Sequence, residues 1–185
     1  DHDIFKSTAF DTPIISIGNL STGGTGKTPM VEYLIQSLGH KYSIAVLSRG
    51  YRRKTSGFLW VEKTESPSKV GDEPLQLKTK FNEVIVAVSE DRVDGVQKIC
   101  KKYPQINLIL LDDAFQHREI DAHFSILLTE YDNLYCDDFF FPTGDLRDER
   151  KSAKRANIIV VTKCPLDMTE ADKLEVLEKL YPEQH

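Results

Sequence analysis

The sequence has no long hydrophobic run. A helix that crosses a bilayer needs about 20 consecutive apolar residues. The longest apolar runs here, 108–111 and 158–161, have only the length of buried strands. No stretch resembles a secretory signal peptide either. We therefore expect no membrane-spanning helix within this chain.

Cysteine is scarce, and its few positions lie far apart. Cys100, Cys136 and Cys164 form no C-x-x-C pair. A disulfide framework or a zinc site needs closer or paired spacings. We expect buried, reduced thiols, as in a cytosolic protein.

An excess of positive charge is also missing. The sequence has 24 Lys and Arg against 29 Asp and Glu, which gives a formal net charge of −5. Proteins that bind nucleic acid through phosphate contacts usually present a strong basic surface. We therefore expect no nucleic-acid partner.

The length is sufficient for one domain with a sizeable core, because the chain has 185 residues. The sequence begins with Asp1 rather than methionine and ends at His185, just past an expected helix. We expect residues 1–185 to form a single domain of a parent protein that is longer at both ends.

Short apolar runs alternate with helix-like stretches along the chain. Most of these runs are continuous, which is typical of strands buried on both faces of a parallel sheet. This pattern predicts an α/β fold, a doubly wound and mostly parallel sheet with helices on both faces. The expected strands are 13–17, 43–47, 58–61, 84–88, 107–111, 124–128 and 157–162, and the expected helices are 28–38, 90–103 and 169–181.

Three stretches lack such periodicity. Residues 52–57 and 62–72 are predicted to be polar loops, and 130–156 a longer irregular region. Long connections inside compact domains are often functional. Within the last stretch, the Phe-Phe-Phe-Pro run at 139–142 is expected in the core rather than as an exposed apolar lip.

A glycine-rich segment, 16–29, joins the first expected strand to the first expected helix. Glycines let successive backbone N–H groups point at one anion. Lys27 adds a positive charge for the β- and γ-phosphates, and Thr28 offers a hydroxyl to Mg²⁺. The helix N-terminus adds its partial positive charge. We predict a phosphate-binding loop for a nucleoside triphosphate, formed by Ser21, Thr22, Gly23, Gly24, Thr25, Gly26, Lys27 and Thr28.

This loop departs from the general pattern G-x-x-x-x-G-K-[ST] at its first position. Ser21 stands where the pattern has glycine, and Gly23 and Gly24 supply flexibility inside the loop. An ordinary glycine turn before Lys-Thr is the alternative. The flanking strand and helix favour the phosphate loop, because the mechanism requires both.

Two carboxylates follow the expected strand 107–111. Asp112 and Asp113 would lie at the C-terminal edge of the sheet, where open α/β sheets bind ligands. There they are candidates to hold Mg²⁺. The alternative is a turn in which one of them caps the next segment. Gln116 and His117 follow at once and are candidate contacts to phosphate or substrate, although a lone histidine in a turn is often structural.

A second acidic pair occurs in Val-Gly-Asp-Glu-Pro at 70–74. Pro74 suits the first turn of a following helix. Asp72 is a candidate base for an acceptor hydroxyl, with Glu73 assisting the metal. Asp72 is equally a good helix N-cap in its own right, and spacing alone leaves both roles open.

Basic residues cluster after the expected strand 43–47. Arg49, Arg52, Arg53 and Lys54 form a run that is usually a solvated loop. In a phosphotransferase, Arg49 and Arg52 would instead hold an anionic acceptor or stabilise transferring charge. Arg147 is a further candidate of the same kind.

Several of these motifs together resemble one known family. The phosphate loop 18–29, with serine at position 21, is similar to that of the tetraacyldisaccharide 4′-kinases, also called lipid A 4′-kinases. The segments 47–51, 70–74, 91–92, 112–117 and 155–162 also resemble that family's blocks, in the same order. The resemblance covers nearly all of 13–163.

This resemblance implies a phosphate-loop kinase that uses ATP and Mg²⁺ to phosphorylate the 4′-hydroxyl of a tetraacyldisaccharide 1-phosphate. The product would be lipid IVA, made at the cytoplasmic face of the Gram-negative inner membrane. By position, Lys27 binds phosphate and Thr28 binds Mg²⁺. Asp72 is the candidate base, and Glu73, Asp112 and Asp113 form the acidic metal-binding group.

Members of that family usually also carry an N-terminal membrane-associating helix and a C-terminal lobe, and we expect neither within residues 1–185. The resemblance therefore implies a fragment, with peripheral membrane contact made by the parent protein. A nucleotide-dependent switch or metal-insertion GTPase acting on a protein partner is the alternative function. Thr162 and Lys163 faintly resemble a guanine-reading T/N-K-x-D segment, but Pro165 occupies its aspartate position.

Overall fold

The computed structural model describes residues 7–140 and 143–180. A seven-stranded sheet in the order β3-β4-β2-β5-β1-β6-β7 runs through them. Six strands are parallel, and β3 pairs with β4 in the antiparallel sense. The strands are β1 (Ile14–Asn19), β2 (Ile44–Ser48), β3 (Leu59–Trp60), β4 (Ile85–Val88), β5 (Leu108–Asp112), β6 (Phe124–Glu130) and β7 (Ile158–Thr162).

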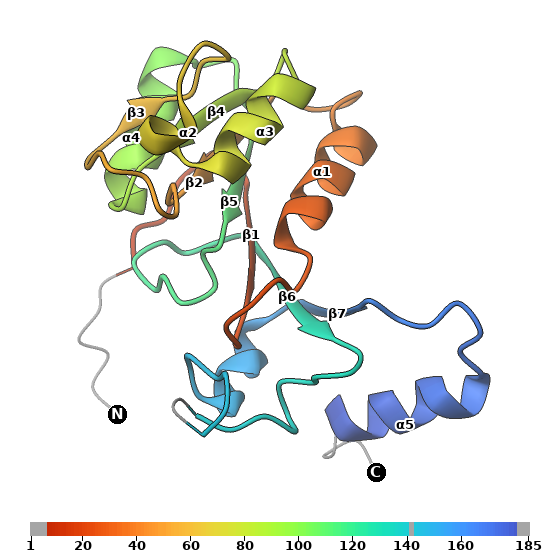
Figure 1. Ribbon diagram of the computed structural model, residues 1–185. Helices are drawn as coiled ribbons and strands as arrows, with labels where there is room; N and C mark the ends of the chain where they lie inside the picture. Colours follow the sequence, from red (N-terminus) through yellow and green to blue (C-terminus); the bar gives the residue numbers. More distant parts are fainter. Residues whose placement is uncertain (1–6, 141–142, 181–185) are drawn as a thin grey trace.

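Helices lie on both faces of this sheet (Figure 1). Residues of α1 and α3 pack on the face that carries Ile17 and Leu110. Residues of α4 and α5 pack on the opposite face. The helices are α1 (Lys27–Leu38), α2 (Pro67–Val70), α3 (Asp72–Lys80), α4 (Arg92–Lys102), the 3₁₀ helix η1 (Arg150–Arg155) and α5 (Glu170–Leu180). The predicted doubly wound, three-layer α/β/α fold is confirmed.

The strand order places a topological switch point beside β1. After β1 the chain moves to β2 on one side, and after β5 it returns to β6 on the other side. Ligands of open α/β sheets bind outside the carboxyl ends of the strands at such a point. The loops that follow β1 and β5 both leave from this position.

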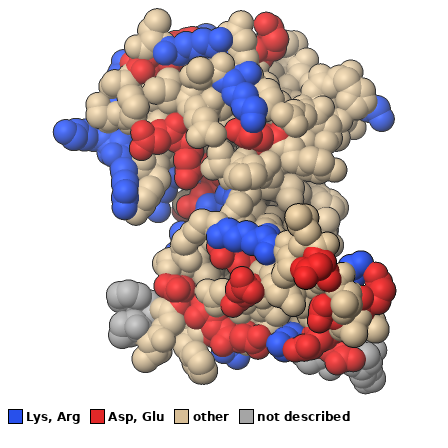
Figure 2. All heavy atoms as spheres, turned by 45° about the vertical axis from the view of Figure 1, so that its right-hand side comes forward, with Lys and Arg blue, Asp and Glu red and all other residues tan. Residues whose placement is uncertain are grey.

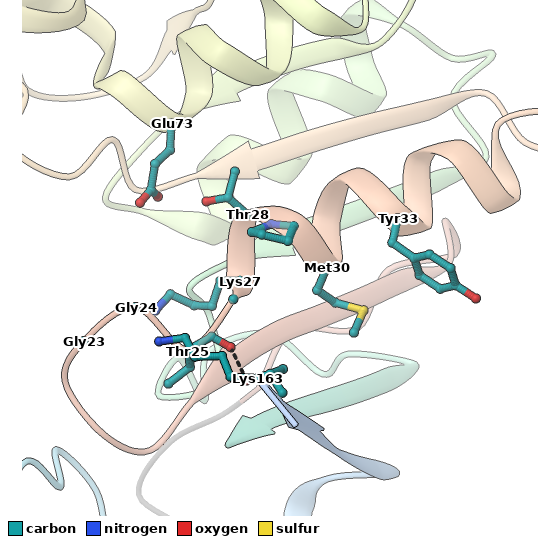
Figure 3. Close-up of a pocket in the computed structure, with 12 residues that line it drawn as sticks. Gly23, Gly24, Thr25, Lys27, Thr28, Met30, Tyr33, Glu73 and Lys163 are labelled. Carbon is teal, nitrogen blue, oxygen red and sulfur yellow. Dashed lines mark hydrogen bonds between the residues drawn. The ribbon is translucent and has the colours of Figure 1, made fainter. Parts of the chain in front are cut away.

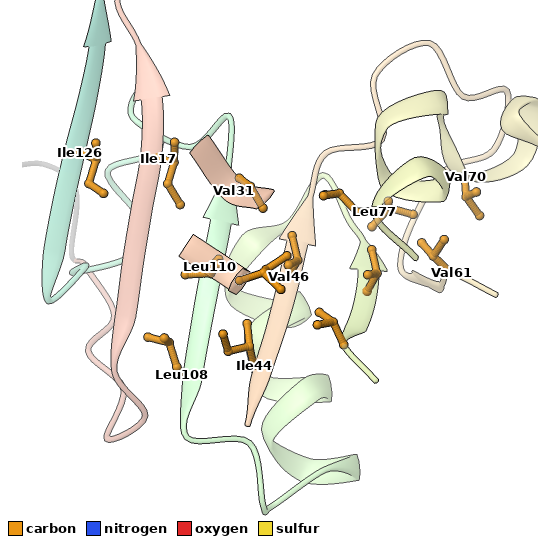
Figure 4. Close-up of a cluster of buried hydrophobic side chains, with 14 of the residues drawn as sticks. Ile17, Val31, Ile44, Val46, Val61, Val70, Leu77, Leu108, Leu110 and Ile126 are labelled. Atoms are coloured by element: carbon orange, nitrogen blue, oxygen red, sulfur yellow. The ribbon is translucent and has the colours of Figure 1, made fainter. Parts of the chain in front are cut away.

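The core is built from the continuous apolar strands. Ile17, Val46 and Leu110 come from three adjacent strands and are fully buried together with Val31 of α1. Figure 4 shows these side chains filling the space between the sheet and the helices on that face. Continuous burial of the strands explains why their sequences do not alternate.

Several local predictions are wrong. The stretch 62–72, expected to be a loop, contains α2 and opens α3. These helices bury few apolar side chains, so the sequence shows little helical periodicity there. Phe139 and Phe140 are 64% and 51% exposed rather than core residues, and 141–142 lie outside the described residues. The cysteines are unpaired, but Cys100 and Cys136 are half-buried and Cys164 is exposed.

Lys and Arg form no single basic surface on the face in Figure 2: both signs occur on its upper half, and Asp and Glu predominate on its lower half. In the part of the chain that the structure describes, no helix combines the length and the apolar character needed to span a bilayer.

The central packing gives a stability prediction. Leu110→Ala removes a fully buried side chain from β5, and we expect it to lower the free energy of unfolding by about 2–5 kcal/mol. Leu174→Ala is the matched control on α5, because Leu174 is 59% exposed, and it should change stability by less than about 0.5 kcal/mol. Denaturant titration measures both, and equal effects would contradict the assigned core.

Candidate active site

The predicted phosphate loop lies between β1 and α1. Gly23 and Gly26 have φ of 112° and 84°, a left-handed conformation in which a side chain is strained. The first turn of α1 has no side-chain cap and no acidic residue. Its uncapped N–H groups and the helix dipole are therefore suited to binding an anion.

A cavity of about 520 Å³ opens at this loop. Residues 23–30 line one side, and Tyr33 of α1, Glu73 of α3, Thr162 and Lys163 complete the lining. In Figure 3 the side chains of Lys27, Thr28 and Glu73 point to the same side of this pocket, and Tyr33 lies farther along α1.

Thr162, at the end of β7, holds the loop from the opposite side of the cavity. Its hydroxyl donates to the carbonyl oxygen of Thr25 at 3.0 Å, drawn as a dashed line in Figure 3. A methyl group at Gly26 would contact the Thr162 side chain at 3.6 Å. The last parallel strand thus forms part of the pocket wall.

A buried amide, that of Asn19, organises the base of the site. Its Oδ1 accepts hydrogen bonds from Lys27 Nζ at 3.2 Å and from Arg147 Nη2 at 2.6 Å. Its Nδ2 donates to the carbonyl oxygen of Ser21 at 2.6 Å. Gln116 Nε2 donates to the Asn19 carbonyl oxygen at 2.6 Å. Asn19 therefore links both cations to the phosphate loop.

Asp113 joins the same cluster. Its Oδ1 lies 3.6 Å from Lys27 Nζ and 3.2 Å from Arg147 Nη2. Although burial opposes its ionisation, Lys27 and Arg147 hold the pKa of Asp113 below its usual range. Asp113 also has a φ of 51°, uncommon for a residue with a side chain. Such strain often accompanies functional positions.

Asp112 occupies a different environment. It is buried, and its Oδ2 accepts from Ser48 Oγ at 3.2 Å while its Oδ1 has no hydrogen-bond partner. Burial, and then the nearby charges of Glu73 and Asp113, raise its pKa to about 6. The buried Arg92 supports this turn by donating to the backbone carbonyl oxygen of Asp112 at 3.1 Å.

The second acidic pair opens α3. Gly71 is the N-cap of this helix, and no side chain caps it. Asp72 and Glu73 are exposed residues of its first turn. The capping role considered for Asp72 is therefore not the one observed, which leaves its carboxylate available on the surface.

The remaining predicted residues are spread around this centre. Arg49 and Arg52 are exposed, and the Arg52 guanidinium lies 5.2 Å from the centre of the Tyr51 ring. His117 lines a separate cavity of about 530 Å³ with Arg118 and Arg155. Burial, and then Arg92 and Arg49, lower the pKa of His117. Arg147 and Gln116 thus lie beside the loop, where both contact Asn19, whereas His117 lines a separate cavity.

Sequence reasoning assigned no role to Asn19, Ser48 or Asp138, and considered Thr162 only as part of a guanine-reading segment. Asn19 was visible as a polar residue ending an apolar strand, which is a usable signal. Asp138 accepts a hydrogen bond from Ser21 Oγ at 3.0 Å across 117 positions of sequence, and no local pattern announces such a contact.

The described residues contain no group of three His, Cys, Asp or Glu arranged to hold a metal ion. Mg²⁺ keeps several water ligands and often uses only one or two carboxylates. The buried Asp112 Oδ1, which has no hydrogen-bond partner, is an acceptor that a cation could occupy. The donor set is therefore compatible with Mg²⁺.

The fold and the site define a phosphate-loop α/β protein. A family model described as tetraacyldisaccharide-1-phosphate 4′-kinase (LpxK) matches residues 1–184. The chain belongs to this family, as the motifs of the sequence predicted.

Two curated relatives illustrate the similarity. A tetraacyldisaccharide 4′-kinase of Flavobacterium johnsoniae is 52% identical over 180 residues, which are 97% of this chain and 53% of that protein. One from Phocaeicola vulgatus is 47% identical over 189 residues, with 100% of this chain and 51% of that protein covered. The chain spans about half the length of the curated relatives that it matches.

A solved structure extends the comparison to three dimensions. The "apo" form of LpxK from Aquifex aeolicus, in complex with ATP, aligns with a TM-score of 0.81 and 36% sequence identity. The alignment covers 90% of this chain and 53% of that one.

The buried carboxyl of Asp112 generates a pH prediction. The folded-state pKa is about 6 against an ordinary value of 3.8, so the folded protein keeps this proton to higher pH. The resulting loss of stability is absent below about pH 4 and complete above about pH 6. We expect Asp112→Asn to raise the free energy of unfolding by about 2–3 kcal/mol at pH 7.5 relative to its effect at pH 4.

Denaturant titrations at the two pH values, without divalent cations, measure this difference. Asp132→Asn is the matched control at an exposed position, and its effect should be small at both pH values. A pH-independent effect of Asp112→Asn would contradict the raised pKa.

Proposed function

We propose that the full-length protein transfers the γ-phosphate of ATP to the 4′-hydroxyl of a tetraacyldisaccharide 1-phosphate and forms lipid IVA. The single observation that carries this proposal is the convergence of Lys27, Arg147 and the Asp112–Asp113 pair beside an uncapped helix N-terminus, in a chain of this kinase family. Phosphoryl transfer requires mainly positioning and charge neutralisation, which such a cluster supplies.

ATP is the proposed nucleotide. The phosphates would lie on residues Ser21 to Thr28, with Lys27 directed at the β- and γ-phosphates. Lys27 is held on Asn19 and Asp113, so it is already positioned at the base of the loop. The rest of the cavity, toward Met30, Tyr33 and Lys163, has room for the nucleoside.

Mg²⁺ is the proposed metal, with Thr28, Glu73, Asp112 and Asp113 as the candidate residues around it. Asp113 is paired with Lys27 and Arg147, whereas Asp112 has a free oxygen. We therefore assign direct coordination to Asp112 and orientation of the cluster to Asp113. When held by these residues, Mg²⁺ would neutralise negative charge that develops on the phosphates during transfer.

Asp72 is the proposed general base. Its carboxylate would take the proton of the 4′-hydroxyl as that oxygen forms its bond to the γ-phosphorus, and ADP would leave. The exposed position of Asp72, one residue before Glu73 of the pocket lining, supports this role. Arg49, Arg52 and Arg147 are proposed to hold anionic groups, and Gln116 and His117 to contact substrate.

The acceptor carries four acyl chains that stay in a lipid phase. We therefore place the full-length protein at the cytoplasmic face of the Gram-negative inner membrane, in peripheral contact with it. A nucleotide-dependent switch remains the competing function, because Thr162 and Lys163 border the nucleotide cavity. Strong partner-stimulated GTP hydrolysis without lipid phosphorylation would favour that switch over the kinase.

Nucleotide binding tests the phosphate loop. Lys27→Ala should weaken ATP binding by about 10–100-fold in calorimetry, because a charged donor to the phosphates is lost. Lys41→Ala, at an exposed position after α1, is the matched control and should leave affinity unchanged. Unaltered ATP affinity of Lys27→Ala would remove the loop from the proposal.

Turnover of the full-length protein tests the base. Asp72→Asn should lower kcat by about 10²–10⁴-fold, while the Kd for ATP stays within about twofold, because Asp72 does not line the nucleotide cavity. Gln76→Ala, at an exposed position on the same helix, serves as the control. A kcat of Asp72→Asn close to that of the unaltered protein would show that another group takes the proton.

A further inference from the structure

Two groups of described residues are joined to the phosphate loop: Asp138, and the residues 145–147. Ser21 and Leu146 form an antiparallel bridge. The N–H of Arg147 donates to the carbonyl oxygen of Leu20 at 2.7 Å, and the N–H of Thr22 donates to the carbonyl oxygen of Asp145 at 2.7 Å. The first half of the loop therefore has a backbone partner more than 100 positions away in sequence.

Side chains reinforce this attachment. Ser21 Oγ donates to Asp138 Oδ2 at 3.0 Å, and Thr22 Oγ1 donates to Asp145 Oδ1 at 2.7 Å. Ser21 and Asp138 are 6% and 8% exposed, so their contact is shielded from water. Hydrogen bonds to an ionised acceptor in such surroundings are stronger than those at the surface.

Asp138 connects three parts of the chain at once. Besides Ser21, its carboxylate accepts from the N–H groups of Phe139 at 2.8 Å and Asp145 at 3.0 Å. The guanidinium of Arg150 donates to its carbonyl oxygen. Asp138 therefore binds Asp145 and Arg150, while Ser21 attaches Asp138 to the loop.

The attachment determines where Arg147 lies. Arg147 follows Asp145 by two residues, and its guanidinium reaches Asn19 Oδ1 and Asp113 Oδ1 beside Lys27. Without the bond from Ser21 to Asp138, the backbone pairing at Leu20 and Thr22 loses its buried anchor. Both the phosphate loop and Arg147 would then sample additional positions.

We propose that Asp138 is a positioning residue for phosphoryl transfer: through Ser21 it fixes the first half of the phosphate loop and brings Arg147 to the transferred phosphate. This inference rests on the proposed function for its account of Arg147. It gives Ser21, which replaces the usual loop glycine, the specific task of donating a hydrogen bond to Asp138.

The test uses the full-length protein with Ser21→Ala, Asp138→Ala and the double variant. Each single variant should raise the Kd for ATP about tenfold and lower kcat, because both release the loop and Arg147. The double variant should lose no more affinity than the stronger single variant, because both remove the same interaction. Asp138→Asn can still accept from the two N–H groups and bond Ser21, so its Kd should stay within about threefold of the unaltered protein.

Asp137→Ala is the control, since it removes a neighbouring carboxylate that is exposed and points at Lys179 instead. Its ATP affinity and kcat should be unchanged. A lower Tm of Asp138→Ala with unchanged ATP affinity and kcat would reduce Asp138 to a structural residue and overturn the proposal. Additive effects of Ser21→Ala and Asp138→Ala would also overturn it.

The readouts separate this inference from the proposed function. If the full-length protein binds ATP but does not phosphorylate the disaccharide, the proposed function fails. The Kd values for ATP of the two single variants and the double variant then still decide the role of Asp138. If Asp138→Ala does not fold, Ser21→Ala decides alone: raised Kd and lowered kcat support the proposal, and unaltered values overturn it.

Discussion

The site depends on the buried amide of Asn19. One side chain accepts from Lys27 and Arg147 and donates to the backbone of Ser21, while its own carbonyl oxygen accepts from Gln116. A side-chain amide offers both acceptor and donor groups, and it can gather two cations without adding a negative charge. An aspartate here would pair with both cations and weaken their attraction for phosphate. The neutral amide of Asn19 therefore keeps the positive charge of Lys27 and Arg147 available at the base of the pocket.

The carboxylates around Asn19 are divided by environment. Asp113 is ionised by its two cationic neighbours, whereas Asp112 lies buried one residue earlier with an elevated pKa and an unpaired oxygen. Asp112 is the last residue of β5, whereas Asp113 lies in the following turn with a φ of 51°, so the two neighbouring acids meet different surroundings. Under the proposed function, Asp113 would orient the two cations and Asp112 would be available to a metal ion.

The sequence predicts the parts that local chemistry determines. Most of the strands are continuous apolar runs, and the phosphate loop combines glycines, lysine and hydroxyl in one segment, so both were recognisable. The helix α3 was not recognisable from the sequence, because few of its residues enter the core. Asp138 and Thr162 were missed as parts of the loop's support, because Ser21 and Thr25 bind them across more than 100 positions. Such contacts follow from the strand order, which a single sequence does not reveal.

The position of β1 in the sheet has a consequence for synthesis on the ribosome. β1 is made first, yet its partners β5 and β6 begin at Leu108 and Phe124, and the pocket wall is completed only by Thr162. The nascent chain must therefore carry an unpaired apolar strand until most of these residues have emerged. Pairing of such distant segments is slow, and it leaves apolar, aggregation-prone surface exposed in the meantime. The strand order therefore delays the pairing of β1 until β5 and β6 have emerged, and the nucleotide pocket is completed later still, when β7 has been made.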